Sequence, residues 1–303
     1  MTDFETLAAD VDADLAREDV AVNGVRLSVV TAGPADGDVV VLLHGFPEFW
    51  YSWRKQIPAL ADAGLRVIVP DMRGYNESEK PRGRDAYRID RLVGDVAGLV
   101  DEFAESGTAH VVGHDWGGAV AWSVASRRAD VVDRLAILNA PHPERFRELL
   151  RTPAQLKRSW YMFTFQLPRV PEWGLRRNGA DAIGQLFADS MPPAETRHYR
   201  EAFLQPGAAT AAINYYRSFI REGARDELPL LSASTPIPDG RVDAPTLVCW
   251  GLDDEALVPA NADGLDEWVP DLRVERIPDA GHWVQLDAAD RVNDALLAHL
   301  DAA

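Results

Sequence analysis

The chain has 303 residues, of which 47% are hydrophobic, and its formal net charge is −17. A chain of this length and apolar content can build a large packed domain, which excludes an intrinsically disordered protein. The excess of acidic residues would repel phosphate groups, so we expect neither nucleic acid nor a membrane as a partner.

Cysteine content and targeting signals narrow the class of protein further. The single cysteine, Cys249, lies in an apolar run, and we expect it to be a core residue. The chain has no Cys/His spacing typical of a metal site, so we predict no metal and no cofactor. The first ten residues are acidic and unlike a signal peptide, and the longest apolar run, 39–43, is too short to span a bilayer. We therefore expect a cytoplasmic protein.

Short β-rich runs alternate with helical patterns over the first 140 residues. Asn23-Gly24 is a two-residue turn signal and predicts a hairpin over 20–30. Further strands are expected at 39–43, 66–69, 109–112 and 135–138, with helices at 51–63, 90–105 and 117–127. The end of the chain resumes this alternation, with strands expected at 245–250 and 272–277 and a helix at 288–300. Apolar strands separated by helices predict a mostly parallel sheet covered on both faces, an α/β fold.

The middle of the chain has a different pattern. From about 143 to about 238 strand signals disappear, and apolar residues recur at helical spacing. Both ends of this stretch are marked by turn-forming residues, namely Pro141, Pro143, Pro236, Pro238 and Gly240. We therefore predict an α/β core formed by 1–142 and 241–303, with a helical cap inserted at 143–240.

A sharp turn is predicted at 113–118, where the sequence reads GHDWGG between an expected strand and an expected helix. A nucleophile on such a strand-turn-helix sits in strained backbone with crowded neighbours, so glycines are required at the flanking positions. Gly113 and Gly117 meet this requirement. The position between them is occupied by Asp115 where serine is usual. The alternative is that Asp115 only caps the following helix.

Two further polar residues follow expected strands. Asp254 lies in WGLDD at 250–254, and His282 lies in DAGHW at 279–283. The order nucleophile, acid, histidine is that of the α/β hydrolases. Asp253 is the rival acid, and the spacing of the first motif favours Asp254. The alternatives are a turn residue for the acid and an ordinary loop residue for His282.

The loop after the strand at 39–43 reads HGFP at 44–47 and can direct the backbone amide of Phe46 at the site. The amide of Trp116, which follows the nucleophile, would be the second donor of an oxyanion hole. Because only backbone groups are used, the side chains of Phe46 and Trp116 are free to line a pocket or to pack in the core.

A carboxylate at the nucleophile position predicts alkyl transfer. Aspartate is ionised at neutral pH and can displace a leaving group at an sp³ carbon, forming an alkyl ester. His282 can then activate a water that hydrolyses the ester, while Asp254 orients the imidazole. Two leaving groups fit this chemistry, a halide or the oxygen of an epoxide ring.

The chain resembles the epoxide hydrolases of the α/β-hydrolase fold. The resemblance is carried by HGFPE at 44–48, PDMRGY at 70–75, GHDWGG at 113–118 and NAPHP at 139–143, with Trp53-Arg54 and the segment after it, and some of these motifs are shared with dehalogenases. It implies a hydrolase that opens a small apolar epoxide with water to a vicinal diol.

The resemblance also implies two cap tyrosines that bind and protonate the epoxide oxygen. Tyr161 and Tyr216 lie in settings similar to theirs, and an Asn-x-Tyr-Arg pattern favours Tyr216 over Tyr215. An alkoxide is a poor leaving group and needs such a donor, whereas a halide does not. The alternative is that both tyrosines only pack the cap.

Three other points stay open at this stage. A haloalkane dehalogenase using the same aspartate and a non-catalytic ligand-binding protein of this fold are the alternative functions. Oligomeric state is open, and a homo-oligomer is compatible with the sequence. An apolar substrate is suggested by large cap residues, namely Trp160, Phe163, Leu167 and Trp173.

Overall fold

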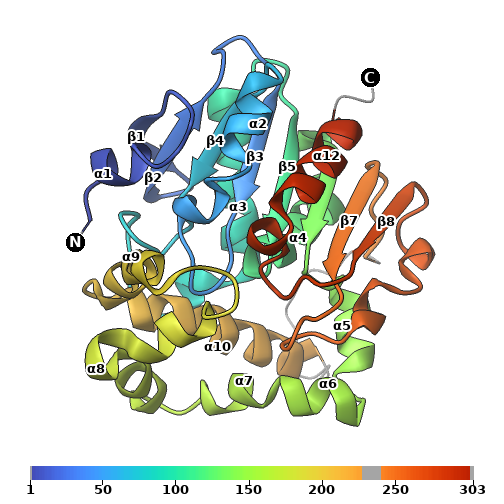
Figure 1. Ribbon diagram of the computed structural model, residues 1–303. Helices are drawn as coiled ribbons and strands as arrows, with labels where there is room; N and C mark the ends of the chain where they lie inside the picture. Colours follow the sequence, from blue (N-terminus) through green and yellow to red (C-terminus); the bar gives the residue numbers. More distant parts are fainter. Residues whose placement is uncertain (1, 227–239, 301–303) are drawn as a thin grey trace.

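The structure is a computed structural model that describes residues 2–226 and 240–300. Its centre is an eight-stranded sheet in the order β1-β2-β4-β3-β5-β6-β7-β8 (Figure 1). The strands are β1 (Ala16–Val22), β2 (Val25–Ala32), β3 (Val39–Leu43), β4 (Arg66–Pro70), β5 (Ala109–His114), β6 (Val132–Leu138), β7 (Thr246–Gly251) and β8 (Leu272–Ile277). Only the pairings of β2 are antiparallel, with β1 and with β4. The predicted mostly parallel sheet is confirmed.

The middle of the sheet is buried on both faces. Every residue of β3, β5 and β7 is buried, as expected for parallel strands that helices cover on both sides. The hairpin between β1 and β2 turns at Asn23-Gly24, where both residues have positive φ angles of 47° and 73°. This is the left-handed backbone that the Asn-Gly sequence predicts.

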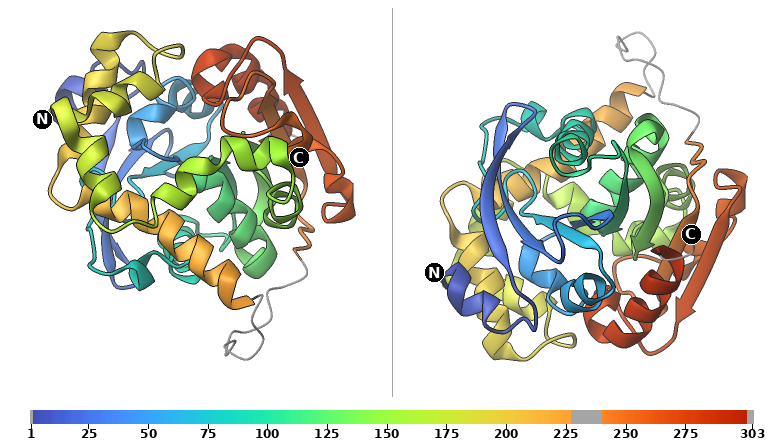
Figure 2. Two further views of the ribbon diagram at one scale, coloured as in Figure 1. Left: turned by 90° about the horizontal axis from the view of Figure 1, so that it is seen from below. Right: turned by 90° about the horizontal axis from the view of Figure 1, so that it is seen from above.

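Helices cover both faces of the sheet. On one face α3 (Ile89–Phe103) packs against α4 (Trp116–Arg127), and on the other α2 (Ile57–Asp62) packs against α12 (Ala289–Leu300) (Figure 2). The short helices α1 (Phe4–Ala8) and α11 (Val284–Asp287) were not predicted. Across the described ranges 2–226 and 240–300, no helix combines the length and apolar character that crossing a membrane requires.

The helix predicted over 51–63 is wrong at its start. Residues Trp50–Trp53 form a 3-10 helix, and α2 begins only at Ile57. Pro58 lies in the first turn of α2, where a missing N–H costs nothing. Further into a helix its ring would clash with the carbonyl four residues earlier. The two short helices therefore replace one continuous helix.

Among the described residues between β6 and β7, the chain forms six α-helices. They are α5 (Pro143–Leu149), α6 (Pro153–Arg158), α7 (Trp160–Thr164), α8 (Val170–Leu186), α9 (Pro193–Leu204) and α10 (Ala208–Asp226). Together they lie beyond one end of the sheet strands, at the bottom of Figure 1. We call this helical layer the cap. Pro236 and Pro238, which mark its predicted end, lie outside the described residues.

Candidate active site

Asp115 lies on the turn between β5 and α4, with backbone angles φ 49° and ψ −117°. The turn is crowded, since a Cβ atom at Gly113 would lie 2.5 Å from the Gly117 carbonyl oxygen. A Cβ atom at Gly117 would lie 2.1 Å from the Leu43 carbonyl oxygen. Only glycine fits at either place. The carboxylate of Asp115 makes no capping hydrogen bond to α4, so the alternative that it only caps this helix is wrong.

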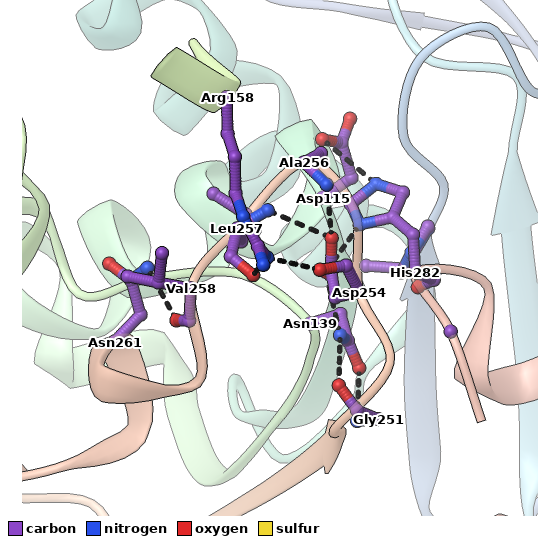
Figure 3. Close-up of polar contacts among 12 residues, drawn as sticks. Asp115, Asn139, Arg158, Gly251, Asp254, Ala256, Leu257, Val258, Asn261 and His282 are labelled. Carbon is purple, nitrogen blue, oxygen red and sulfur yellow. Dashed lines mark hydrogen bonds and ion pairs between the residues drawn. The ribbon is translucent and has the colours of Figure 1, made fainter. Parts of the chain in front are cut away.

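The imidazole of His282 lies between two carboxylates (Figure 3). Its Nδ1 is 2.8 Å from Oδ2 of Asp254, and its Nε2 is 3.5 Å from Oδ2 of Asp115. Asp254 is buried behind β7, whereas Asp253 is exposed. The structure therefore brings Asp115, His282 and Asp254 together and leaves Asp253 outside the group.

The charges of these three groups depend on one another. Burial disfavours a charged His282, but Asp254 and Asp115 outweigh burial and raise its pKa well above 6.5. Burial also works against the charge of Asp115, and the hydrogen bond and charge of His282 overcome it and lower the pKa of that carboxyl. The pKa of Asp254 is lowered against burial by the charge and hydrogen bond of His282. The charged forms of the three groups therefore stabilise one another.

The two oxygens of Asp115 have different surroundings. Oδ1 accepts a hydrogen bond of 2.8 Å from the backbone N–H of Phe46, while Oδ2 faces His282. Trp116 is the first residue of α4, so its N–H has no acceptor four residues earlier within the helix. The amide of Phe46 therefore binds the carboxylate, and the amide of Trp116 stays a predicted second donor. The peptide between Phe46 and Pro47 is cis.

Tyr161 on α7 and Tyr216 on α10 face the site from the cap. Their ring centroids are 5.8 Å apart. The Tyr216 ring packs edge-on against Phe46 at 5.5 Å and against Trp116 at 5.0 Å. Burial raises the pKa of both phenols above the usual 10, and the charge of Asp115 raises it further. Both phenols therefore keep their protons at neutral pH.

Tyr215, the neighbour of Tyr216, has a different position. It is buried, and its hydroxyl donates a 2.7 Å hydrogen bond to the backbone carbonyl of Arg73 in the core. This contact ties α10 to the loop after β4. The preference for Tyr216 over Tyr215 agrees with this placement.

Asn139 has a role that sequence reasoning missed. Its Nδ2 donates to Oδ2 of Asp254 at 2.8 Å, and its Oδ1 accepts from the Gly251 N–H at 2.7 Å. The other oxygen of Asp254 accepts from the amides of Ala256 and Leu257 at 2.7 and 2.8 Å. These contacts fix the carboxylate that orients His282. The NAPHP motif marks Asn139 in the sequence, but the motif alone does not indicate which residue Asn139 contacts.

Glu48 and His114 form a second buried group behind the site. Oε2 of Glu48 accepts from the Gly45 N–H at 2.6 Å and lies 2.9 Å from Nδ1 of His114. Nε2 of His114 lies 2.9 Å from the backbone carbonyl of His282. The group joins the loop of Phe46 to the loop of His282. Both residues lie inside motifs that the sequence analysis quoted without assigning them a role.

Helix α6 of the cap is fastened to the loop that carries Asp254. Arg158 donates to the backbone carbonyls of Asp254 and Leu257, the latter at 2.8 Å (Figure 3). Gln155 donates to the Ala256 carbonyl at 3.0 Å and accepts from the Val258 N–H at 3.0 Å. The position of the cap is therefore linked to the acid loop of the core.

The four large cap residues expected to indicate an apolar substrate are on the outside. Trp160, Phe163, Leu167 and Trp173 are each at least half exposed, so their side chains do not support the inference of an apolar substrate. The inward positions on the same stretch are instead occupied by residues such as Met162 and Phe165. On α7 apolar residues lie on both faces, Met162 inward and Trp160 and Phe163 outward, which made the sequence pattern ambiguous.

The arrangement brings together a carboxylate, an imidazole and two phenols. Asp115 has one oxygen on a backbone amide, His282 can exchange protons beside it, and the two phenols approach from the cap. Such a set can attack an sp³ carbon, protonate a leaving oxygen and hydrolyse the resulting ester. None of these steps needs a redox or acyl-carrier group.

The chain is similar to known proteins over most of its length. The family described as the alpha/beta hydrolase fold matches residues 38–289. AB hydrolase superfamily protein YfhM from Bacillus subtilis (strain 168) is 41% identical over 287 residues, covering 93% of this chain and 96% of that protein. Epoxide hydrolase 4 from Mus musculus is 34% identical over 290 residues, covering 92% and 77%. A crystal structure of Bacillus megaterium epoxide hydrolase with an inhibitor superposes with a TM-score of 0.83 at 31% identity, covering 94% of this chain and all of that one.

Proposed function

The chain belongs to the epoxide hydrolases of the α/β-hydrolase fold, and from this premise we propose that it opens an epoxide to a vicinal diol through an ester on Asp115. The observation that carries the proposal is the pair of contacts to Asp115, Oδ1 on the amide of Phe46 and Oδ2 facing His282. The proposed substrates are a small apolar epoxide and water. The cytoplasmic location stays a prediction from the sequence.

In the first step, Oδ2 of Asp115 attacks a ring carbon of the epoxide. A carbon–oxygen bond of the ring breaks as the ester bond forms, and Tyr161 or Tyr216 donates a proton to the leaving oxygen. The burial that raises the pKa of these phenols keeps the proton available until the alkoxide develops. The ester carbonyl oxygen is then Oδ1, already bound to the Phe46 amide.

In the second step, His282 takes a proton from a water that attacks the carbonyl carbon of the ester. The charge that develops on Oδ1 is stabilised by the amides of Phe46 and Trp116, at about 2.7–4 kcal/mol per donor. Ester formation also removes the charge of Asp115, one of the two that raise the pKa of His282. The pKa therefore falls, which favours the neutral imidazole that this step needs, and the proton it gives up can return to the tyrosinate left by the first step. When the tetrahedral intermediate collapses, the bond between its carbon and Oδ2 breaks, and His282 passes the proton taken from water to Oδ2, which leaves as a hydroxyl of the diol. The proton that remains on the carboxyl of Asp115 then returns to His282.

The phenols favour an epoxide over a haloalkane as substrate. A halide leaves without a proton, so a dehalogenase gains nothing from two buried phenols beside its nucleophile. A binding-only protein would not need an intact group of Asp115, His282 and Asp254. Both alternatives are outcomes of the following experiment.

The test is a panel of styrene-like epoxides, aliphatic epoxides, haloalkanes and p-nitrophenyl esters, with products measured for the natural chain and for Asp115→Ala. We expect diols from epoxides and none from Asp115→Ala. Halide release without diol formation would identify a dehalogenase, and no product from any substrate would support a binding protein.

A single turnover in heavy-oxygen water tests the ester itself. The isotope should appear first in the carboxylate of Asp115, detected by mass spectrometry of the peptide that contains it. Isotope found directly in the diol, with an unlabelled peptide, would contradict the covalent route.

A further inference from the structure

The outer face of the cap carries a row of exposed apolar side chains. They are between 45% and 64% exposed and lie on α6, on α7, in the loop after α7 and at the start of α8. They are Leu156, Trp160, Phe163, Leu167, Val170 and Trp173. This stretch faces the viewer in the left panel of Figure 2, on the side of the molecule away from the sheet. We call these six residues the apolar row.

The row is not part of the packing between cap and core. The inward side of the same helices is formed by the buried residues Gln155, Ser159, Met162 and Phe165. The outer side would be expected to be polar on a helix that packs through one face. Large exposed apolar groups that gather in one place mark a surface that binds something.

The charge around the row is opposite to that of the whole chain. Residues 151–177 contain six basic side chains and one acidic one, whereas the chain has a net charge of −17. The single acid, Glu172, is paired with Arg217 at 2.7 Å. Arg151, Lys157 and Arg169 are exposed, and within 2–226 and 240–300 they form no ion pair. Residues 151–177 therefore form a basic segment, which we call the basic island, in a chain that is acidic as a whole.

We propose that the apolar row and its basic residues bind an anionic lipid surface. Helices that lie on membranes combine Trp, Phe and Leu with Lys and Arg, and aromatic rings favour the level of the lipid head groups. The guanidinium of Arg177 lies 4.6 Å from the centre of the Trp173 ring, so charge and aromatic surface are adjacent. Clustered cations near an anionic leaflet each add to the attraction.

The net negative charge does not prevent this binding. Screening in salt limits charge interactions to about 8 Å at physiological ionic strength. A membrane in contact with the row is therefore affected mainly by the residues nearest to it, and residues 151–177 carry a net positive charge. The expectation that the chain has no membrane partner rests on the total charge, and this proposal departs from it because the charge is unevenly distributed along the chain.

A second copy of the chain fits the surface less well than lipid. A two-fold symmetric dimer brings the same patch of both subunits together, and here it would oppose one basic island to another. An anionic lipid surface offers both a hydrocarbon region for the apolar side chains and negatively charged head groups for the basic ones.

The row is placed where lipid contact would affect the site. Its residues Trp160 and Phe163 flank Tyr161 on α7, and Tyr161 faces Asp115 from the inner side of that helix. The binding itself is independent of the reaction. Only its use, collection of apolar epoxides dissolved in lipid, rests on the proposed function.

The experiment measures flotation of the full chain with vesicles at low and high salt. We expect binding to phosphatidylcholine vesicles that contain phosphatidylglycerol, weaker binding in high salt, and little binding to phosphatidylcholine alone. Lys157→Glu with Arg169→Glu should weaken binding by at least about tenfold, because about 1 kcal/mol is expected for each basic residue near such a surface. Trp160→Ser with Phe163→Ser should weaken it to a similar degree.

Matched controls change the same residue types elsewhere. Arg82→Glu with Arg91→Glu reverses two exposed charges outside the row, and Leu186→Ser removes an exposed leucine of the cap that is not in the row. Both should bind vesicles like the natural chain. Absence of vesicle binding by the natural chain, or equal loss in the controls, would overturn the proposal. Dimers in sedimentation velocity that only the row variants abolish, without vesicle binding, would assign the surface to a second copy and overturn it as well.

Discussion

The core and cap halves of the site are held in place by different forces. In the core, the carboxylate of Asp254 has four polar contacts of 2.7–2.8 Å, with His282, Asn139 and two backbone amides. In the cap, Tyr216 is held largely by ring contacts, with Phe46, Trp116 and Phe165 at 5.0–5.5 Å.

The difference follows from what each half has to do. Hydrogen bonds to a charged group are directional and strong, so the core can fix a charge to within a fraction of an ångström. Ring packing is worth about 0.5–1.5 kcal/mol per pair and tolerates small shifts. We therefore expect the cap side of the site to tolerate small shifts more readily than the carboxylate and imidazole of the core. Substitutions in each half test this division.

His282→Gln breaks the core half. We expect turnover to fall by at least about 10³-fold, because the base for ester hydrolysis is lost. Asp115 can still attack, so the alkyl ester should accumulate in proportion to enzyme and be visible as added mass of the intact chain. Full turnover, or loss of turnover without added mass, would contradict the assignment of His282 to the second step.

Tyr161→Phe combined with Tyr216→Phe breaks the cap half. Loss of the proton donors should slow ring opening by about 10²–10⁴-fold. In contrast to His282→Gln, no ester should accumulate, since the first step is affected. Tyr199→Phe, a buried cap tyrosine that bonds Ser52 and Arg54 instead, is the matched control. Unchanged rates in the double variant would remove the phenols from the mechanism.

The site residues of the core could be predicted from the sequence more directly than those of the cap. Asp115, Asp254 and His282 each follow a strand, and carboxyl ends of parallel strands meet at one edge, so their proximity was predictable. The tyrosines came only from resemblance, because helical spacing does not say which face is inward. Positions 155, 159 and 162 and positions 156, 160 and 163 have the same spacing, yet only the first set is buried. Contacts such as those of Asn139 and Glu48 join distant segments and leave no local pattern.

Asn139→Ala weakens the core half without removing a reacting group. One charge-assisted hydrogen bond to Asp254 is lost, worth about 1.5–3 kcal/mol. We expect turnover to fall by about tenfold or somewhat more, with partial accumulation of the ester, because His282 is less well oriented. Slower ring opening with no ester would place the effect in the first step and contradict this role.

The pH dependence of stability tests the charge coupling at His282. In the unfolded chain the pKa of His282 is about 6.5, and in the folded chain it is raised well above that value. The raised pKa therefore stabilises the folded chain fully below about pH 6.5. This stabilisation is lost as the pH rises through the pKa of the folded state. Asp115→Ala removes one carboxylate, so the pKa of His282 should fall and the loss should be complete at a lower pH. A fall of one unit in the pKa of His282 corresponds to about 1.4 kcal/mol less stabilisation of the folded chain below about pH 6.5. Histidine NMR titration, with His282→Gln for assignment, measures the change, and an unchanged pKa would contradict the coupling.

The positions of the two halves of the site also determine the stereochemistry of the diol product. The carboxylate of Asp115 approaches from the core and the phenols from the cap, so the epoxide must lie between them with its oxygen toward the cap. Backside attack then inverts the configuration of the carbon that is attacked and leaves the other carbon unchanged. With a symmetric meso epoxide, an excess of one diol enantiomer would therefore report directly which of two otherwise identical carbons the protein presents to its aspartate.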